Sequence, residues 1–310
     1  MTGRAARGNA RGDGMTPVTD AVPRFGATDT MGNDYQRFDA PHFDYGLWES
    51  PFDRSIQLRG PAVDRTRPYV VCLGAAPTFG RFCREPYPEL LSRHLGMAVL
   101  NAGVAGAGPA TFLRGGWGEW LDGAAAVVVQ VLAARSESNS LFESDPARGV
   151  LGVRRADRRA MRFEAFLQSL VDTADSATVR RVVEETRQNY VDNMSRLLEG
   201  IRAPKILLWL SKRLPRYDLD DRKIHGILKA HPQLVDDAML DRIRRHADGL
   251  VECVSTTGIP QRLWPATDPL PGTTLEDGFL VNRYYPSPEM HALAAARLAA
   301  ACRSILPSAR

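Results

Sequence analysis

The chain of 310 residues carries 40 Lys and Arg against 36 Asp and Glu, a net charge of +4 at pH 7. Hydrophobic residues make up 44% and charged residues 25%, which is typical of a soluble globular protein with its own core. The basic residues are spread along the chain rather than clustered with aromatics, which argues against nucleic-acid binding. No apolar run approaches the roughly 20 residues that cross a bilayer, which excludes a transmembrane segment.

The N-terminal 20 residues contain Arg, Gly and Asn where a signal peptide has a continuous apolar stretch. We therefore expect a cytoplasmic protein. The cysteines lack the CxxC spacing of metal sites, and we expect reduced thiols, no metal and no cofactor. They are Cys72, Cys83, Cys253 and Cys302.

The N-terminal part of the chain divides into two segments. Residues 1–38 are rich in Gly, Arg, Asp and Thr and lack hydrophobic periodicity, so they are expected to form a disordered tail. Residues 39–68 are aromatic but interrupted by Pro and Gly, which indicates an ordered arm packed on the domain. Its expected anchors are Phe43, Tyr45, Trp48 and Phe52.

From residue 69 onward, short apolar runs alternate with longer amphipathic ones, a pattern typical of βαβ units and a parallel sheet. The runs are aliphatic without strict alternation, as in strands covered on both faces. We predict a three-layer α/β/α sandwich with a five-stranded, flavodoxin-like parallel sheet in one domain over residues 69–305. The expected strands are Tyr69–Leu73, Ala98–Asn101, Ala126–Leu132, Lys205–Leu210 and Leu250–Val254.

Helices are expected between these strands, with residues 150–201 forming a helical insertion. The final helix is expected to have Ser287 as its N-cap and Pro288 at its first position, where the missing donor and fixed φ of proline are tolerated. It is expected to end near Ile305. The remaining helices are predicted at residues 87–95, 156–172, 177–201, 221–230 and 233–247.

Ligands of an open parallel sheet lie beyond the carboxyl ends of its strands. In this chain four of the five ends are rich in Gly, Ser, Thr or Asn, as loops that approach a ligand often are. The segments are 74–80, 102–109, 133–140, 211–215 and 255–260.

Four segments resemble the conserved blocks of the SGNH (GDSL-type) hydrolase superfamily in order and spacing. The first block, G-D-S-x-T-x-G, stands here as Gly74-Ala75-Ala76-Pro77-Thr78-Phe79-Gly80. The second is the Gly-rich loop after Asn101, the third is the segment up to Asn139, and the last is matched through Pro286. The resemblance covers residues 69–305 and implies the SGNH-like fold.

At the positions that the resemblance assigns to the catalytic triad, the residues differ from Ser, Asp and His. Ala76 stands at the nucleophile position, Asn282 at the acid position and Tyr285 at the base position. A nucleophilic serine needs a hydroxyl and an adjacent base, and a phenol with a pKa near 10 is a poor base at neutral pH. A register with His291 as the base puts Pro288 at the acid position and still leaves Ala76 without a hydroxyl. His291 is alternatively a packed histidine.

Other polar residues near the expected sheet edge are candidates for ligand binding, because arginine forks, hydroxyls and backbone amides suit carboxylate, sulfate or phosphate groups. The alternative is that they are structural: Gly74 and Gly80 as turn glycines, Arg135 paired with Glu137 or Asp145, and the 212–213 pair as a solvated loop. The candidates are Thr78, Gly106, Arg135, Ser136, Ser138, Asn139, Lys212 and Arg213.

Three functions remain open. The first is a non-hydrolytic SGNH-like protein that binds a small molecule or glycan, with a link to bacterial surface polysaccharide production that the resemblance implies. The second is an enzyme of another kind, either a sulfo-, phospho- or acyltransferase or an esterase with a non-standard nucleophile. The third is a scaffold protein that assembles through the aromatic arm.

Overall fold

A computed structural model describes residues 33–50, 53, 56–114, 116–146, 149–218 and 223–306. The expected tail over residues 1–32, the anchor Phe52 and the side chain of Ser136 lie outside what it describes. Within these ranges, no helix is both long and apolar enough to span a membrane.

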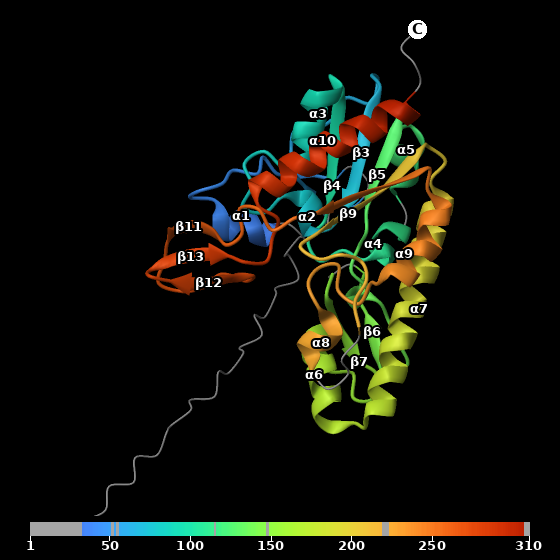
Figure 1. The fold of residues 1–310 in the computed structure, drawn as a ribbon, viewed down its shortest axis with the longest axis vertical. Helices are drawn as coiled ribbons and strands as arrows, with labels where there is room; N and C mark the ends of the chain where they lie inside the picture. The colour runs from blue at the N-terminus through green and yellow to red at the C-terminus, as the bar shows by residue number, and fades with distance from the viewer. Residues whose placement is uncertain are drawn as a thin grey trace, which may run out of the picture.

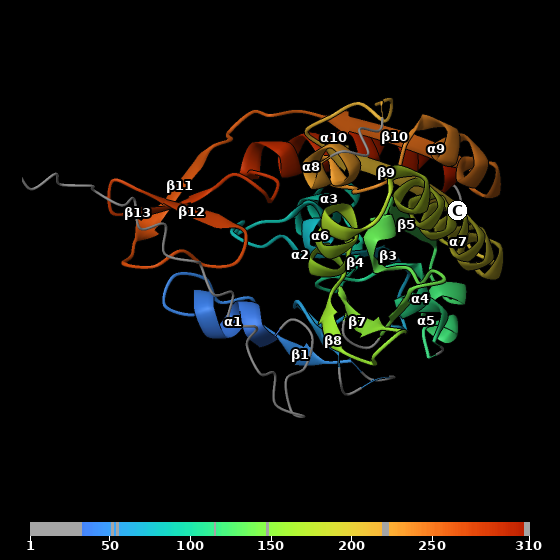
Figure 2. The ribbon, with the colours of Figure 1, turned by 90° about the horizontal axis from the view of Figure 1, so that it is seen from below.

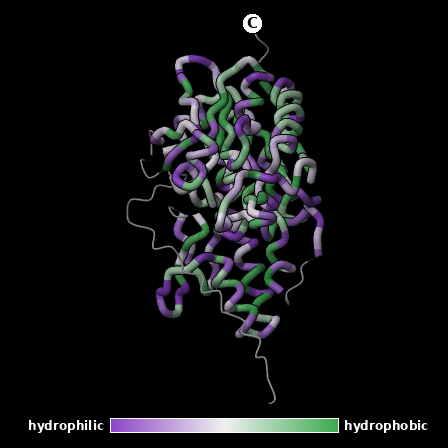
Figure 3. The backbone as a smooth tube through the Cα atoms, turned by 90° about the vertical axis from the view of Figure 1, so that its left-hand side faces the viewer, coloured by the Kyte–Doolittle hydropathy of each residue, from purple (hydrophilic) through white to green (hydrophobic). Residues whose placement is uncertain are grey.

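The centre of the molecule is a five-stranded parallel sheet in the order β10-β9-β5-β3-β4. All five predicted strands are present, and the buried runs that predicted them form the sheet. Figure 3 shows hydrophobic stretches through the middle of the molecule. The strands are β3 (Tyr69–Gly74), β4 (Ala98–Gly103), β5 (Ala126–Gln130), β9 (Lys205–Ser211) and β10 (Gly249–Val254).

Helices cover both faces of this sheet (Figure 1). One face packs against α3 (Tyr87–Leu95) and α10 (Pro288–Ile305). The Ser287 hydroxyl caps α10 by accepting a bond from the Met290 N–H at 3.2 Å, as predicted. The other face packs against four helices, and the prediction of a three-layer α/β/α fold is confirmed. These are α4 (Pro109–Leu113), α5 (Gly118–Asp122), α7 (Ser176–Gly200) and α9 (Asp237–Ile243).

The helix predicted at 156–172 is wrong over its first half. Residues 151–162 form a hairpin, β7 (Leu151–Arg154) and β8 (Ala160–Arg162), which pairs with β6 (Phe142–Ser144). Only α6 (Phe163–Thr173) is helical, because apolar side chains recur at helical spacing only from Phe163 onward. The supposed helical insertion at 150–201 is therefore a hairpin followed by two helices.

Two other predicted helices are shorter than expected. The helix predicted at 221–230 is α8 (Ile224–Leu228), and the one at 233–247 is α9 followed by a 3₁₀ turn, η2 (Arg244–His246). Asp236 caps α9 by accepting from the Met239 N–H at 2.9 Å, which sets where that helix begins.

The N-terminal segment is more regular than predicted. Residues 33–38, predicted to belong to a disordered tail, form α1 (Asn33–Asp39) together with the first residue of the arm. The arm also contains the paired strands β1 (Trp48–Glu49) and β2 (Gln57–Leu58). A small antiparallel sheet absent from the prediction lies on the same side as α1 (Figure 2). Its strands are β11 (Gln261–Pro265), β13 (Phe279–Asn282) and β12 (Thr273–Glu276).

Candidate functional site

The turn after β3 enters the short helix α2 (Ala76–Phe79) directly. Gly80 ends that helix at φ +79°, a left-handed conformation that glycine adopts without strain. Gly74 is crowded, because a Cβ there would lie 2.0 Å from the Thr78 Oγ1. Both glycines are therefore explained by the geometry of the turn.

The structure brings together the three positions that the resemblance assigned to a triad. Ala76 is 7% exposed and packs in an apolar cluster with Phe82 and Tyr285. The Asn282 Oδ1 accepts from the Tyr285 N–H at 2.8 Å, and its Nδ2 donates to the Tyr285 carbonyl at 3.1 Å. Asn282 therefore holds the loop of Tyr285 in place over Ala76.

Helix α1, at the start of the described chain, packs against this cluster. Arg81 donates to both carboxylate oxygens of Asp39, at 2.9 and 3.1 Å, and both side chains are at most 1% exposed. Arg81 also donates to the Tyr285 hydroxyl at 3.2 Å, while the Tyr35 hydroxyl lies 3.4 Å from the same oxygen. Because α1 supplies Tyr35 and Asp39, it packs over the cluster that contains Ala76.

Gln130, at the end of β5, is a central polar residue that the sequence analysis missed. Its Oε1 accepts from the Thr78 hydroxyl at 2.7 Å and from the N–H groups of Ala75 and Thr78 at 3.1 and 3.2 Å. Thr78 is fully buried, and its hydroxyl also lies 2.8 Å from the Tyr87 hydroxyl. Thr78 is thus committed to the turn. The available signal was one glutamine within the apolar run Val127–Leu132.

His231 is a second residue that the sequence analysis missed. The three bonds to the Gln130 Oε1 orient that amide, so its Nε2 donates to the His231 Nε2 at 2.8 Å. That ring nitrogen is therefore unprotonated and already occupied. Burial, together with the positive charge of Arg135, lowers the pKa of His231 to about 3. A neutral histidine bound in this way cannot serve as a general base.

His291 is a packed histidine. It is fully buried, and its Nδ1 accepts from the Tyr87 N–H at 3.2 Å. Burial, followed by the charge of Arg59, lowers its pKa to about 3. Its Nε2 has no hydrogen-bond partner among the described residues, and no hydroxyl bonds to it.

A small recess remains beside the cluster. Its cavity volume is about 10 Å³, room for about one water molecule. Lys212 lines it, donates to the Arg283 carbonyl, and has a pKa lowered by burial. The other lining residues are Pro77, Leu210, Ser211, His231, Tyr284, Tyr285, Pro286 and Met290.

The two predicted arginines at this edge have structural partners. Arg135 forms an ion pair with Glu164, rather than with Glu137 or Asp145. Arg213 donates to five backbone carbonyls, two of them in Pro232 and Val235 at 2.6 Å, and burial lowers its pKa to about 10. Arg213 therefore fixes the segment after β9, and these bonds occupy its N–H donors.

The other predicted residues lie against β6, β7 and α7. Gly106, at φ +74°, would bring a Cβ within 3.4 Å of Gly149. Ser136 lies in the 3₁₀ turn η1 (Ala134–Ser136), and the Ser138 hydroxyl accepts from the Ser144 N–H at 3.0 Å. The Asn139 Oδ1 accepts from two N–H groups, those of Leu141 and Phe142. These residues are separate from the Ala76 cluster.

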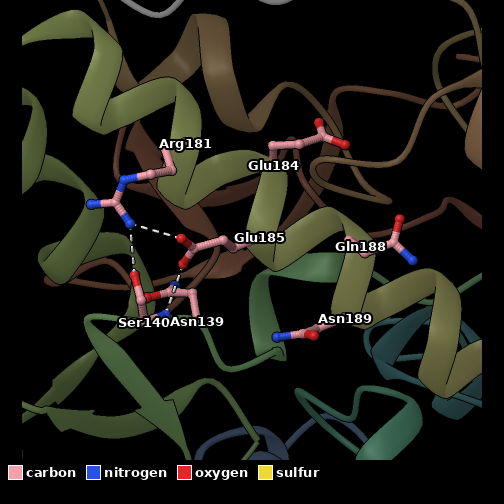
Figure 4. Close-up of a pocket in the computed structure, with 7 residues that line it drawn as sticks. All are labelled: Asn139, Ser140, Arg181, Glu184, Glu185, Gln188 and Asn189. Atoms are coloured by element: carbon pink, nitrogen blue, oxygen red, sulfur yellow. Dashed lines mark hydrogen bonds and ion pairs between the residues drawn. The ribbon is translucent and has the colours of Figure 1, made fainter.

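A groove of about 610 Å³ runs along α7 (Figure 4). Glu185 accepts from the Ser140 N–H at 2.9 Å and from Arg181 at 2.7 Å. The first bond connects the loop that contains Ser140 to α7. Glu184 is exposed and has no hydrogen bond or ion pair among the described residues. The residues that line the groove carry amide, carboxylate, hydroxyl and guanidinium groups: Asn139, Ser140, Arg181, Glu184, Glu185, Gln188 and Asn189.

Comparison with solved structures finds lipases and esterases. The chain is similar to a phospholipase A1 from Streptomyces albidoflavus NA297 (11% identity, 76% of this chain and 98% of that chain, TM-score 0.41). It is also similar to an extracellular lipase from Streptomyces rimosus (13%, 76% and 99%, TM-score 0.38). A third similar structure is a carbohydrate esterase family 2 enzyme from Corynascus thermopiles (Myceliophthora fergusii). Its sequence identity is 16%, the match covers 80% of this chain and 69% of that chain, and the TM-score is 0.36.

At such scores these similarities say nothing about the activity of this chain. No curated protein matches its sequence. One family model covers most of the chain, from residue 35 to residue 306. The chain therefore belongs to the family described as the domain of unknown function DUF6473.

Proposed function

We propose that this protein is an SGNH-hydrolase-like protein without serine-esterase activity, and that it binds a carbohydrate-type ligand in the groove along α7. Its link to bacterial surface polysaccharide production rests on the sequence resemblance alone. The observation that carries the first part is the closed cluster over Ala76.

That cluster lacks the components of serine hydrolysis. Ala76 has no hydroxyl, and its neighbours Phe82 and Tyr285 are packed against it. The histidines nearest this edge, His231 and His291, are neutral, and each has a ring nitrogen occupied as an acceptor. A nucleophile and a free base within hydrogen-bond reach of each other are what this chemistry needs.

The α7 groove supports the second part. A polyhydroxylated ligand presents hydrogen-bond donors and acceptors together. The groove offers donors and acceptors as well, from side chains of positive and of negative charge. The Glu184 carboxylate has no hydrogen bond or ion pair among the described residues, and Arg181 retains N–H donors beyond those that it gives to Ser140 and Glu185. A volume near 610 Å³ lies within the range of ordinary ligand sites.

The proposal is tested by measuring binding of neutral and acidic oligosaccharides to the full chain on a glycan array, then by calorimetry. Glu184→Ala is expected to weaken binding of the best glycan about tenfold, because one charge-assisted bond is lost. Glu252→Ala, at an exposed position of β10, is the matched control and should bind normally. Equal binding by both variants, or no glycan binding by the wild type, would contradict it.

The transferase alternative predicts a different result. A thermal shift with nucleotide-type donors, and none with any glycan, would favour group transfer. Labelling of a serine by a fluorophosphonate probe would instead favour an esterase with a non-standard nucleophile.

A further inference from the structure

The tip of the β7–β8 hairpin concentrates positive charge. Residues 154–162 contain five arginines and one aspartate, so the segment has a net charge of 5 − 1 = +4. The whole 310-residue chain has the same net charge. The arginines are Arg154, Arg155, Arg158, Arg159 and Arg162; the last four are exposed, and Arg154 is half-buried.

The loop of this hairpin places one of these arginines in the left-handed region of the backbone. Arg158 has φ +57°, a left-handed conformation that glycine adopts without strain. Arg155 and Arg158 both donate to the Glu143 carboxylate, at 3.2 and 2.7 Å, while Arg159 has no acidic partner among the described residues. The Arg158 N–H donates to the Arg154 carbonyl at 2.9 Å, so this conformation closes the hairpin loop and leaves the Arg158 side chain exposed.

The hairpin adjoins the α7 groove. The Arg155 Nε donates to the Asn139 carbonyl at 3.1 Å, and Asn139 lines the groove. In Figure 1, β6 and β7 lie between α6 and α7. A ligand that leaves the groove past Asn139 therefore meets the arginines.

The surroundings select among polyanions. The exposed large hydrophobic side chains of the described residues are Phe38, Leu214 and Leu275, and none lies on this hairpin or in this groove. A protein interface needs apolar or aromatic anchors, and single-stranded nucleic acid needs aromatics for stacking. Membrane association is likewise strengthened by inserted apolar groups. A hydrophilic polymer that bears carboxylates fits best, because guanidinium forks bind carboxylates through two parallel bonds.

We propose that Arg155, Arg158 and Arg159 bind the carboxylates of an acidic polysaccharide whose adjacent sugars occupy the α7 groove. This inference rests on the proposed function and adds that the ligand is acidic. Wild-type protein is expected to bind an oligogalacturonate more tightly than a neutral oligosaccharide of equal length, and to lose that preference as salt rises.

The test compares two triple variants by calorimetry. Arg155→Gln/Arg158→Gln/Arg159→Gln is expected to bind oligogalacturonate roughly tenfold more weakly, with binding of the neutral oligosaccharide unchanged. Arg67→Gln/Arg114→Gln/Arg245→Gln removes the same charge from exposed positions elsewhere and should bind oligogalacturonate within about twofold of wild type. Arg158→Gly should preserve the fold, because glycine adopts φ +57° freely. The variant should melt no lower than wild type yet bind oligogalacturonate more weakly.

The outcomes separate the two proposals. The acidic specificity would be overturned if the wild type bound acidic and neutral oligosaccharides equally well, or if both triple variants lost the same affinity for oligogalacturonate. Either result would leave the glycan proposal standing. Binding to neither oligosaccharide would overturn both. Tighter binding to poly-U RNA or to phosphatidylserine vesicles would reassign the hairpin to a nucleic acid or a membrane.

Discussion

The cluster over Ala76 and the groove along α7 both follow strands of the same sheet, yet they differ in access. Around Ala76, donors and acceptors are bonded within the protein, and α1 covers the site. The groove is open, and Glu184 has no bonded partner among the described side chains. Position at the carboxyl edge of a sheet thus defines where a site can form, and packing determines whether a ligand can reach it.

The arm is the part of the closed region whose removal should have the largest effect. Asp39→Ala leaves the Arg81 guanidinium buried and unpaired, so the free energy of unfolding in urea should fall by about 3–5 kcal/mol. Glu119→Ala removes an acid from an exposed ion pair with Arg65 and should leave stability nearly unchanged. An equal decrease in the free energy of unfolding in both variants would mean that the arm does not hold the cluster closed.

Glu137, a buried carboxyl group that bonds to Asn193 of α7, should make stability depend on pH. It is 2% exposed, Asn193 donates to one of its oxygens, and burial raises its pKa to about 8. The folded state therefore retains a proton that the unfolded state loses above about pH 4.5. Stability is full below that pH and falls towards pH 8, by up to about 1.4 kcal/mol per pH unit.

Glu137→Gln should abolish this dependence. The variant is expected to be more stable than wild type at pH 8, by about 2 kcal/mol or more, and similar to it at pH 4.5. Urea unfolding at both pH values provides the measurement. If the free energy of unfolding changed equally with pH in the two proteins, Glu137 would not ionise in this interval.

Asn139 tests how firmly the groove is built. Asn139→Ala removes acceptors from the N–H groups of Leu141 and Phe142, and a bond of 3.0 Å to the Thr186 hydroxyl. We expect a loss of about 1–2 kcal/mol in urea unfolding and weaker glycan binding, because the groove wall moves. Weaker binding without any loss of stability would instead make Asn139 a direct ligand contact.

Restoring a hydroxyl should have the smallest effect. Ala76→Ser is expected to cost about 1 kcal/mol, because the new hydroxyl enters an apolar cluster, and to give no turnover of an aryl ester. His231 and His291 cannot activate it, since their pKa values are lowered to about 3. Turnover by Ala76→Ser alone would reveal a base that the closed cluster conceals.

The strands and the last helix were predictable because each rests on local pattern. All five buried runs became strands, and Ser287 with Pro288 marked the start of α10. The β7–β8 hairpin was mistaken for a helix because its charged tip has no period of its own. The β11–β13–β12 sheet was missed, since strands of four or five residues depend on pairing that the local sequence does not specify.

The roles of the arginines could not be predicted. Arg59, Arg81 and Arg213 look no different in sequence from Arg158, but the first three are turned inward. Arg59 donates to four carbonyls at the end of α2 and in the segment that follows it, and Arg81 pairs with a carboxylate 42 residues away. Such contacts depend on tertiary distances, so the list of ligand-binding candidates included residues that the fold itself uses.

The most direct test of the closed site is exposure of the full-length protein to a fluorophosphonate probe, with mass spectrometry of any adduct. We expect no labelled serine and no aryl-ester hydrolysis above the buffer rate. A stoichiometric adduct on one serine, with turnover lost when that serine is replaced, would contradict the account.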